Sequence, residues 1–225
     1  MPNFIEHLYI LPILLFSVVV HELSHGYMAL RLGDPTAKMM GRLTLNPIPH
    51  IDPIGSVLVP LFSLFFAGQI FIAWAKPVPI NPIYFSNFRR DDILVSIVGP
   101  ISNIFMTLVC TIFYIILMLL SPLILNINFE LLTELWSFLA KMFMGGIYLN
   151  IILAVFNMIP IPPLDGSHVV ASILPDKLSI PYRQIGFLGI FVIIMLMRVD
   201  GFRTIFFTIV QLISYPFTSL IQIFI

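Results

Sequence analysis

The amino-acid sequence predicts an all-α, polytopic membrane protein with about five to six transmembrane helices. Apolar residues make up 59% of the 225 residues, only 10% are charged, and the mean hydropathy is +1.04. Soluble domains average about 45–50% apolar and about 25% charged residues, so a lipid bilayer is the expected surrounding. The net charge is zero, so no basic field indicates a nucleic-acid partner. The single cysteine, Cys110, excludes an intramolecular disulfide.

Six apolar runs are candidates for segments that span or enter the bilayer, because a spanning helix needs about 20 mostly apolar residues. We interpret the whole sequence, 1–225, as a single transmembrane domain built from these runs. They are 8–30, 54–75, 93–120, 138–159, 184–198, which is short, and 203–225.

Two stretches between the runs do not have the composition of helices. Residues 31–53 are rich in Gly, Pro and Asn and alternate in part between apolar and polar residues, which predicts turns and short strands, with the strands over 36–46. The stretch that follows run 54–75 contains three prolines, which exclude a helix. We expect strands or a re-entrant loop between the first helix and the helix over 93–120.

The basic residues favour one of two topologies. Cytoplasmic loops carry an excess of Lys and Arg. If 54–75 crossed the membrane, the two basic loops would lie on opposite sides; if it enters and returns, both are cytoplasmic. The charge rule favours the re-entrant arrangement, with the N-terminus outside, and the sequence alone leaves both open. The basic residues are Arg31, Lys38 and Arg42 in the first loop and Lys76, Arg89 and Arg90 in the second, whereas 121–137 has none.

The first apolar run carries a His-Glu-x-x-His motif, formed by His21, Glu22 and His25. Residues four apart share one face of a helix, so both imidazoles can bind one metal ion. Glu22, one position further round, can then take a proton from a water beside that metal. Zinc suits two imidazoles with a carboxylate and leaves a fourth position for water. The alternative is a histidine pair that lines a polar helix seam, although ionisable groups at membrane depth are mostly functional.

A zinc site of this kind needs a third protein ligand, for which Asp165 is the best candidate. It lies in NMIPIPPLDGSH, after run 138–159, where prolines end the helix and Gly166 allows a tight turn. Such a stretch is also an ordinary helix-ending turn, so both interpretations stay open. The topology favours the interpretation of Asp165 as a metal ligand. If 54–75 is re-entrant, Asp165 lies on the same side of the membrane as the histidines; if 54–75 is a full span, Asp165 lies on the opposite side.

Three motifs follow one another along the chain. They are His21-Glu22-x-x-His25, Gly99-Pro100-x-x-Asn103, and Asn157-x-x-Pro160 leading to Leu164-Asp165-Gly166. In order, spacing and flanking residues they resemble the signatures of the site-2 protease family of intramembrane zinc metalloproteases. The stretches HELSHGYMALRLGD, NPIPHIDPIG and WAKPVPINP are similar to the compact bacterial branch of that family, without a PDZ domain. The resemblance covers roughly residues 9–175.

This resemblance implies a zinc endopeptidase that hydrolyses peptide bonds of membrane-embedded proteins in regulated intramembrane proteolysis. It implies one Zn²⁺ per chain, bound by His21, His25 and Asp165. Glu22 would be the general base that activates water, and Asn157 would lie beside the developing oxyanion.

The resemblance also implies a transmembrane protein or peptide as substrate, presented to the site as an extended strand. Its implied contacts are the 36–46 strands, the 54–75 segment and Asn103, although Asn103 can equally hydrogen-bond between helices of the bundle. The expected location is the cell membrane, the bacterial cytoplasmic membrane in particular, with several spans and the active site nearer the cytoplasmic side. Nothing in the sequence specifies an oligomeric state.

Two other functions are compatible with these residues. A membrane metal-ion transporter also places His and Asp in the bilayer, but these ligands cluster at one depth and no chain of further ligands continues outward. A proteolytically inactive, helix-binding relative is less compatible with an intact Glu22. Two further histidines keep open roles: His168 can reach the metal region or a substrate backbone, and His50 with Asp52 fits a turn better than catalysis.

Overall fold

A computed structural model describes residues 9–58, 76–127 and 129–225 of the chain. Within these ranges every regular element is a helix, which confirms the predicted all-α fold class. In chain order they are α1 (Ile10–Arg31), α2 (Thr36–Met39), η2 (Ile48–His50), η3 (Pro53–Leu58), η4 (Pro82–Tyr84), α4 (Phe88–Leu125), α5 (Glu130–Asn157), α6 (Asp165–Ile173), α7 (Asp176–Gln184), α8 (Leu188–Leu196) and α9 (Asp200–Phe224).

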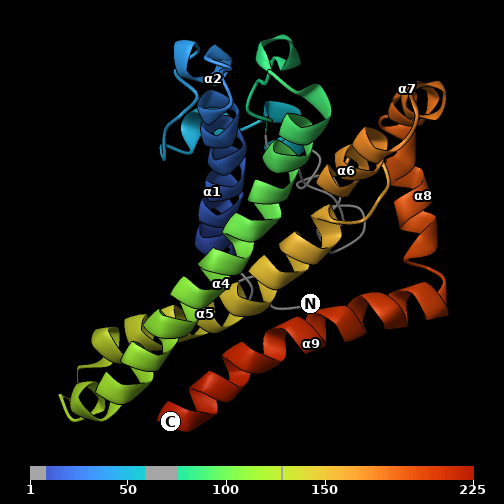
Figure 1. The fold of residues 1–225 in the computed structure, drawn as a ribbon. Coiled ribbons are helices and arrows are strands. Elements are labelled where there is room, and N and C mark those ends of the chain that lie inside the picture. Colours follow the sequence, from blue (N-terminus) through green and yellow to red (C-terminus); the bar gives the residue numbers. More distant parts are fainter. Residues whose placement is uncertain (1–8, 59–75, 128) are drawn as a thin grey trace.

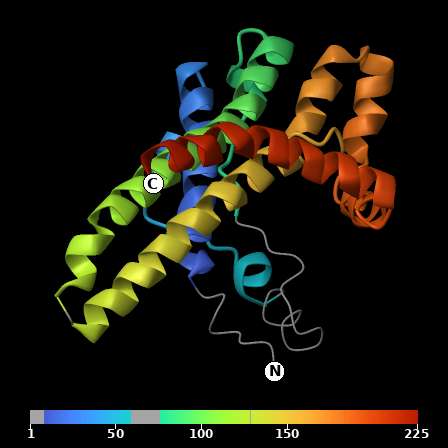
Figure 2. The same cartoon turned by 90° about the horizontal axis from the view of Figure 1, so that it is seen from below.

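The long helices α1, α4 and α5 pack against one another and form the centre of the molecule (Figure 1). Helix α4 runs antiparallel to both α1 and α5, so the end of α1, the start of α4 and the end of α5 lie on one side of the molecule. Helix α9 crosses α4 and α5 (Figure 2). The shorter helices α6, α7 and α8 connect α5 to α9. This arrangement gathers all three sequence motifs on the same side.

Four of the described helices are long and apolar enough to cross a membrane: α1, α4, α5 and α9. The bent pair of α7 and α8, which meet at 83°, can make a fifth span. These helices correspond to five of the six predicted apolar runs. The remaining run, 54–75, lies mostly outside the described residues.

The short strands predicted over 36–46 are not present, and α2 with a series of turns takes their place. The Asp34 carboxylate accepts a hydrogen bond from the Thr36 backbone N–H at 2.9 Å, which favours a helical turn at this point. Its other oxygen accepts from the Asn81 N–H at 2.7 Å and ties the two loops together. Gly41, with φ of +64°, turns the chain after α2. Local turn chemistry therefore outweighs the partial alternation of the sequence.

The two residues that flank segment 51–75, His50 and Lys76, lie next to each other. The carbonyl of His50 accepts a hydrogen bond from the Lys76 N–H at 2.9 Å. The Arg42 guanidinium donates to the carbonyls of Lys76 and Pro77 at 2.9 and 3.2 Å and fastens the same junction. The ends of a full span would be separated by about 30 Å of hydrocarbon. The chain thus resumes on the side of the molecule where α1 ends; residues 59–75 themselves lie outside the described part.

The end of α5 and the start of α6 position the third sequence motif, which contains Asp165. Helix α5 ends at Asn157, shortly before Pro160, Pro162 and Pro163, none of which can donate a backbone hydrogen bond. The chain turns through these prolines and begins α6 at Asp165. The turn directs the Asp165 carboxylate toward α1.

Candidate metal centre

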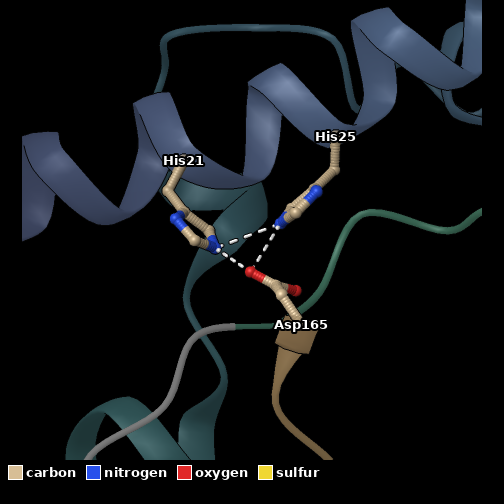
Figure 3. A group of neighbouring side chains, drawn as sticks. All are labelled: His21, His25 and Asp165. Atoms are coloured by element: carbon tan, nitrogen blue, oxygen red, sulfur yellow. Dashed lines mark hydrogen bonds and ion pairs between the residues drawn. The ribbon is translucent and has the colours of Figure 1, made fainter. Parts of the chain in front are cut away.

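His21, His25 and Asp165 lie together in the folded chain (Figure 3). The two histidines are one helical turn apart on α1, and Asp165 reaches them from the start of α6. The Oδ2 atom of Asp165 is 3.2 Å from Nε2 of His21 and 3.4 Å from Nε2 of His25. The two Nε2 atoms are 3.0 Å apart. The three residues that the sequence singles out as possible ligands are therefore neighbours.

The second nitrogen of each imidazole is held by a hydrogen bond. Nδ1 of His25 lies 2.7 Å from the carbonyl oxygen of Val95, which can only accept, so Nδ1 carries the proton. Nδ1 of His21 lies 2.6 Å from Oδ1 of Asn103. When both rings are neutral with Nδ1 protonated, both Nε2 lone pairs face Asp165. A ligand histidine is commonly oriented in this way by a bond to its other nitrogen.

The arrangement fits a bound zinc ion. Three acceptor atoms face one another at 3.0–3.4 Å, and the Oδ2 atom of Asp165 is buried without a hydrogen-bond partner. For tetrahedral zinc with bonds of about 2.0–2.1 Å, ligand atoms lie about 3.3 Å apart. Metal binding needs the carboxylate form of Asp165 and neutral imidazoles, and the protons on both Nδ1 atoms leave the two Nε2 atoms free for the metal.

Gly99 allows α4 to approach the histidines closely. A Cβ atom at this position would overlap with ring atoms of both His25 and His21. The glycine of the Gly-Pro-x-x-Asn motif is therefore required by space, and any side chain there would displace the imidazoles. The same motif places Asn103 one turn further along α4, where it contacts His21.

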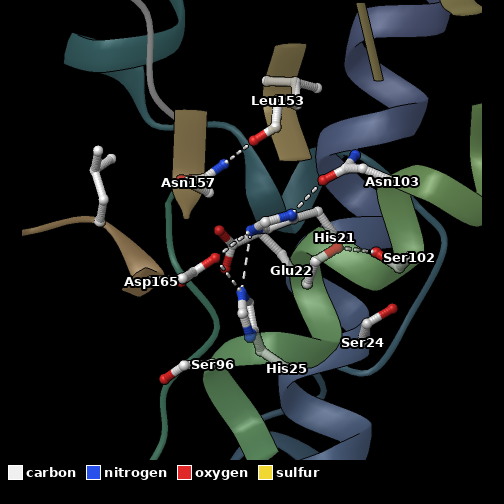
Figure 4. A network of polar contacts seen from close by, with 12 residues as sticks. His21, Glu22, Ser24, His25, Ser96, Ser102, Asn103, Leu153, Asn157 and Asp165 are labelled. Atoms are coloured by element: carbon white, nitrogen blue, oxygen red, sulfur yellow. Dashed lines mark hydrogen bonds and ion pairs between the residues drawn. The ribbon is translucent and has the colours of Figure 1, made fainter. Parts of the chain in front are cut away.

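Glu22 lies beside the histidine and aspartate cluster (Figure 4). Its Oε2 atom accepts a hydrogen bond from the Val78 backbone N–H at 2.8 Å. Val78 is buried and stands between Pro77 and Pro79, which restrict the backbone on both sides. The segment after residue 75 thus holds the Glu22 carboxylate, a contact that the sequence does not reveal.

Asn157 and Asn103 have different surroundings (Figure 4). The side-chain amide of Asn157 donates to the carbonyl of Leu153 in its own helix at 3.0 Å. Asn103 is fully buried and binds His21 through Oδ1, while its Nδ2 donates to Oδ1 of Asn150 at 3.0 Å. The catalytic role of Asn157 and the substrate contact of Asn103 stay predictions.

The two other histidines within the described ranges lie outside the cluster. Nδ1 of His168 is 3.2 Å from Asp92, which also pairs with Arg183 at 2.8 Å. His50 is buried and its Nε2 donates to the Thr44 carbonyl at 3.0 Å, which suits a role in a turn.

The sequence profile of peptidase family M50 matches residues 9–197. The chain belongs to peptidase family M50. This confirms the resemblance to site-2 proteases and identifies the chain as a metalloprotease of that family. Since the relatives below are named zinc metalloproteases, zinc is the implied metal.

Curated relatives support this membership. The chain is 35% identical over 188 residues to "Putative zinc metalloprotease YwhC" of Bacillus subtilis, covering 84% of this chain and 79% of the relative. It is 27% identical over 191 residues to "Putative zinc metalloprotease Rip2" of Mycolicibacterium smegmatis, covering 80% of this chain and 64% of that protein. The Mycobacterium tuberculosis Rip2 is 31% identical over 153 residues, which are 68% of this chain and 52% of the relative. No solved structure matches the chain.

Proposed function

We propose that this M50 peptidase is an intramembrane zinc endopeptidase that hydrolyses peptide bonds of membrane-embedded proteins. One observation carries the proposal: two histidines of a membrane-length helix and Asp165 direct three acceptor atoms at a common point, with Glu22 beside them. This is the donor set of a hydrolytic zinc site.

His21, His25 and Asp165 would hold the zinc ion. When bound, zinc supplies Lewis-acid activation of water and of the scissile carbonyl. The protein holds the two imidazoles through Val95 and Asn103, so the ligand atoms are oriented in advance.

Glu22 is the proposed general base. Its carboxylate would take a proton from the attacking water and return it to the nitrogen of the leaving amine. The Val78 N–H holds one carboxylate oxygen and leaves the other for this proton transfer. An extended substrate backbone has to enter beside this group, because a helical peptide bond is shielded by its own hydrogen bonds.

The two asparagines would act only after a change of partner. For Asn157 to stabilise the oxyanion, its amide nitrogen has to leave the Leu153 carbonyl. For Asn103 to contact substrate, it has to release His21 or Asn150. Release of His21 by Asn103 would leave a metal ligand without its orienting hydrogen bond, which is costly. Asn157 is therefore the better candidate for a residue that contacts substrate.

We further propose that residues 1–225 form one metalloprotease domain of the bacterial cytoplasmic membrane, with the site nearer the cytoplasmic side. The relatives are bacterial, and the basic loops 31–53 and 76–92 lie at the end of α1 and the start of α4, on the side that holds the metal centre. Single cysteines placed in 76–92 of a Cys110→Ser protein should react with a membrane-impermeant thiol reagent only in inside-out vesicles. Labelling from outside intact cells would contradict this orientation.

A reconstituted system separates the protease from the two other functions. In liposomes, the purified chain should cleave labelled single-span peptides that carry helix-breaking residues, a chelator should stop cleavage, and added zinc should restore it. Zinc flux into the liposomes that survives Glu22→Gln would support a transporter instead. A zinc-loaded chain that binds such peptides and leaves them intact would support an inactive relative.

A further inference from the structure

A chain of buried side-chain amides connects the metal centre to α5. Asn103 on α4 and Asn150 on α5 are both fully buried, in the interior formed by α1, α4 and α5. Leaving such amides unpaired in an apolar interior is costly, so their hydrogen bonds strongly constrain their orientation. Figure 4 shows the contact between Asn103 and His21, where this series of amides meets the metal centre.

The Gly146 carbonyl, at the α5 end of this series of amides, determines which group donates and which accepts in each of its hydrogen bonds. The Gly146 carbonyl can only accept, so Nδ2 of Asn150 donates to it, at 2.9 Å. Oδ1 of Asn150 then faces Asn103 and accepts from its Nδ2 at 3.0 Å. Asn103 therefore presents its own oxygen to His21, 2.6 Å from Nδ1. An acceptor at this place requires the proton on Nδ1 and leaves the Nε2 lone pair directed at Asp165.

A reversed Asn103 amide would have the opposite effect. It would present NH₂ to Nδ1 of His21, so the ring would carry its proton on Nε2, between the ligand atoms. That tautomer cannot bind a metal through Nε2. With Asn150 in place, the reversed amide would set the Asn103 oxygen against the Asn150 oxygen, two acceptors in a buried site.

His25 shows why only one of the two histidines needs this arrangement. Its Nδ1 is held by the Val95 backbone carbonyl, whose direction is set by helix α4. A backbone carbonyl cannot exchange donor for acceptor, but a side-chain amide can by rotating. His21 therefore depends on a further residue to keep the Asn103 amide in one orientation.

We propose that Asn150 is a positioning residue of the metal centre: it orients the Asn103 amide and so keeps His21 in the tautomer whose Nε2 binds metal. The inference rests on the proposed function of His21 as a zinc ligand. It gives Asn150, which belongs to none of the three sequence motifs, a role in orienting a metal ligand through Asn103.

Zinc affinity of the full-length chain in detergent, measured by competition with a chelator, tests this role. Asn150→Leu should bind zinc about 10–100-fold more weakly, the usual effect of losing an outer partner. The matched control is Thr111→Val. Thr111 is equally buried on α4 and donates only to the Thr107 carbonyl, at 2.8 Å. Its replacement should leave zinc affinity unchanged.

A rescue experiment distinguishes orientation from packing. A carboxylate at position 103 can only accept a hydrogen bond, so it would hold the Nδ1 proton of His21 without help from Asn150. The double variant Asn103→Asp/Asn150→Leu should therefore recover the larger part of the affinity that Asn150→Leu loses. Thermal unfolding of the metal-free proteins reports the fold separately. If Asn150→Leu does not fold, Asn150→Ala replaces it in the same comparison.

The outcomes separate this inference from the proposed function. A wild-type chain that binds zinc, with Asn150→Leu of equal affinity, would overturn the positioning role alone. So would a loss of affinity that Asn103→Asp does not reduce, because it would indicate a packing role. A wild-type chain that binds no zinc would overturn the proposed function and this inference with it.

Discussion

Glu22→Gln should keep its zinc and lose peptide hydrolysis by about 10²–10⁴-fold, the usual contribution of a positioned general base. The amide has nearly the shape of the carboxylate, and its oxygen can still accept the Val78 N–H that Glu22 accepts at 2.8 Å. The substitution therefore removes the proton acceptor and keeps the local structure. Zinc content after purification and the rate of cleavage of a single-span peptide in liposomes measure the two effects separately.

Asn157→Ala gives the contrast for this experiment. If Asn157 donates to the oxyanion, its loss should lower kcat by about 10²–10³-fold, with zinc content unchanged. Residual cleavage by Asn157→Ala should depend on Glu22, because the proton transfer is separate from oxyanion stabilisation.

Cleavage by Glu22→Gln at the wild-type rate would contradict the proposed mechanism. Loss of zinc together with cleavage in Glu22→Gln would assign Glu22 to the metal site instead of proton transfer.

The sequence predicts the parts of this site that depend on local periodicity. His21 and His25 are neighbours because residues four apart share one face of a helix, whatever the rest of the chain does. The basic loops limit the topology and so predict Asp165 on the side of the histidines, and in the structure its Oδ2 atom lies 3.2 Å from Nε2 of His21. These inferences need only helix geometry and the sidedness of the chain.

Other contacts depend on how helices pack and could not be predicted. Asn150 is visible in the sequence as a polar residue in an apolar run, which predicts a polar partner but not its identity. Its partner Asn103 is 47 residues away, and their contact depends on the rotation of α5 against α4. The Val78 contact with Glu22 likewise spans 56 residues. The partial alternation of residues 36–46 predicts strands, whereas the nearby Asp34 side chain favours a helical turn.

Asp165→Ala should abolish stoichiometric zinc binding. The carboxylate is the one anionic ligand of the cluster, and without it only two neutral imidazoles, whose Nε2 atoms are 3.0 Å apart, remain to bind the cation. Loss of an outer partner typically costs about 10–100-fold in metal affinity, and loss of a direct ligand should cost more. Metal content of the protein purified in detergent, determined by elemental analysis, measures the effect.

The matched control is Asp176→Ala at the start of α7. Asp176 is also the first residue of a helix, but it is 85% exposed and pairs with Arg89 at the surface, a kind of contact that contributes little to stability. This variant should bind zinc like the wild type and cleave at the same rate. If Asp165→Ala keeps one zinc per chain, the third ligand lies elsewhere. The orphaned Oδ2 atom of Asp165 would then need another cation or donor to explain its burial.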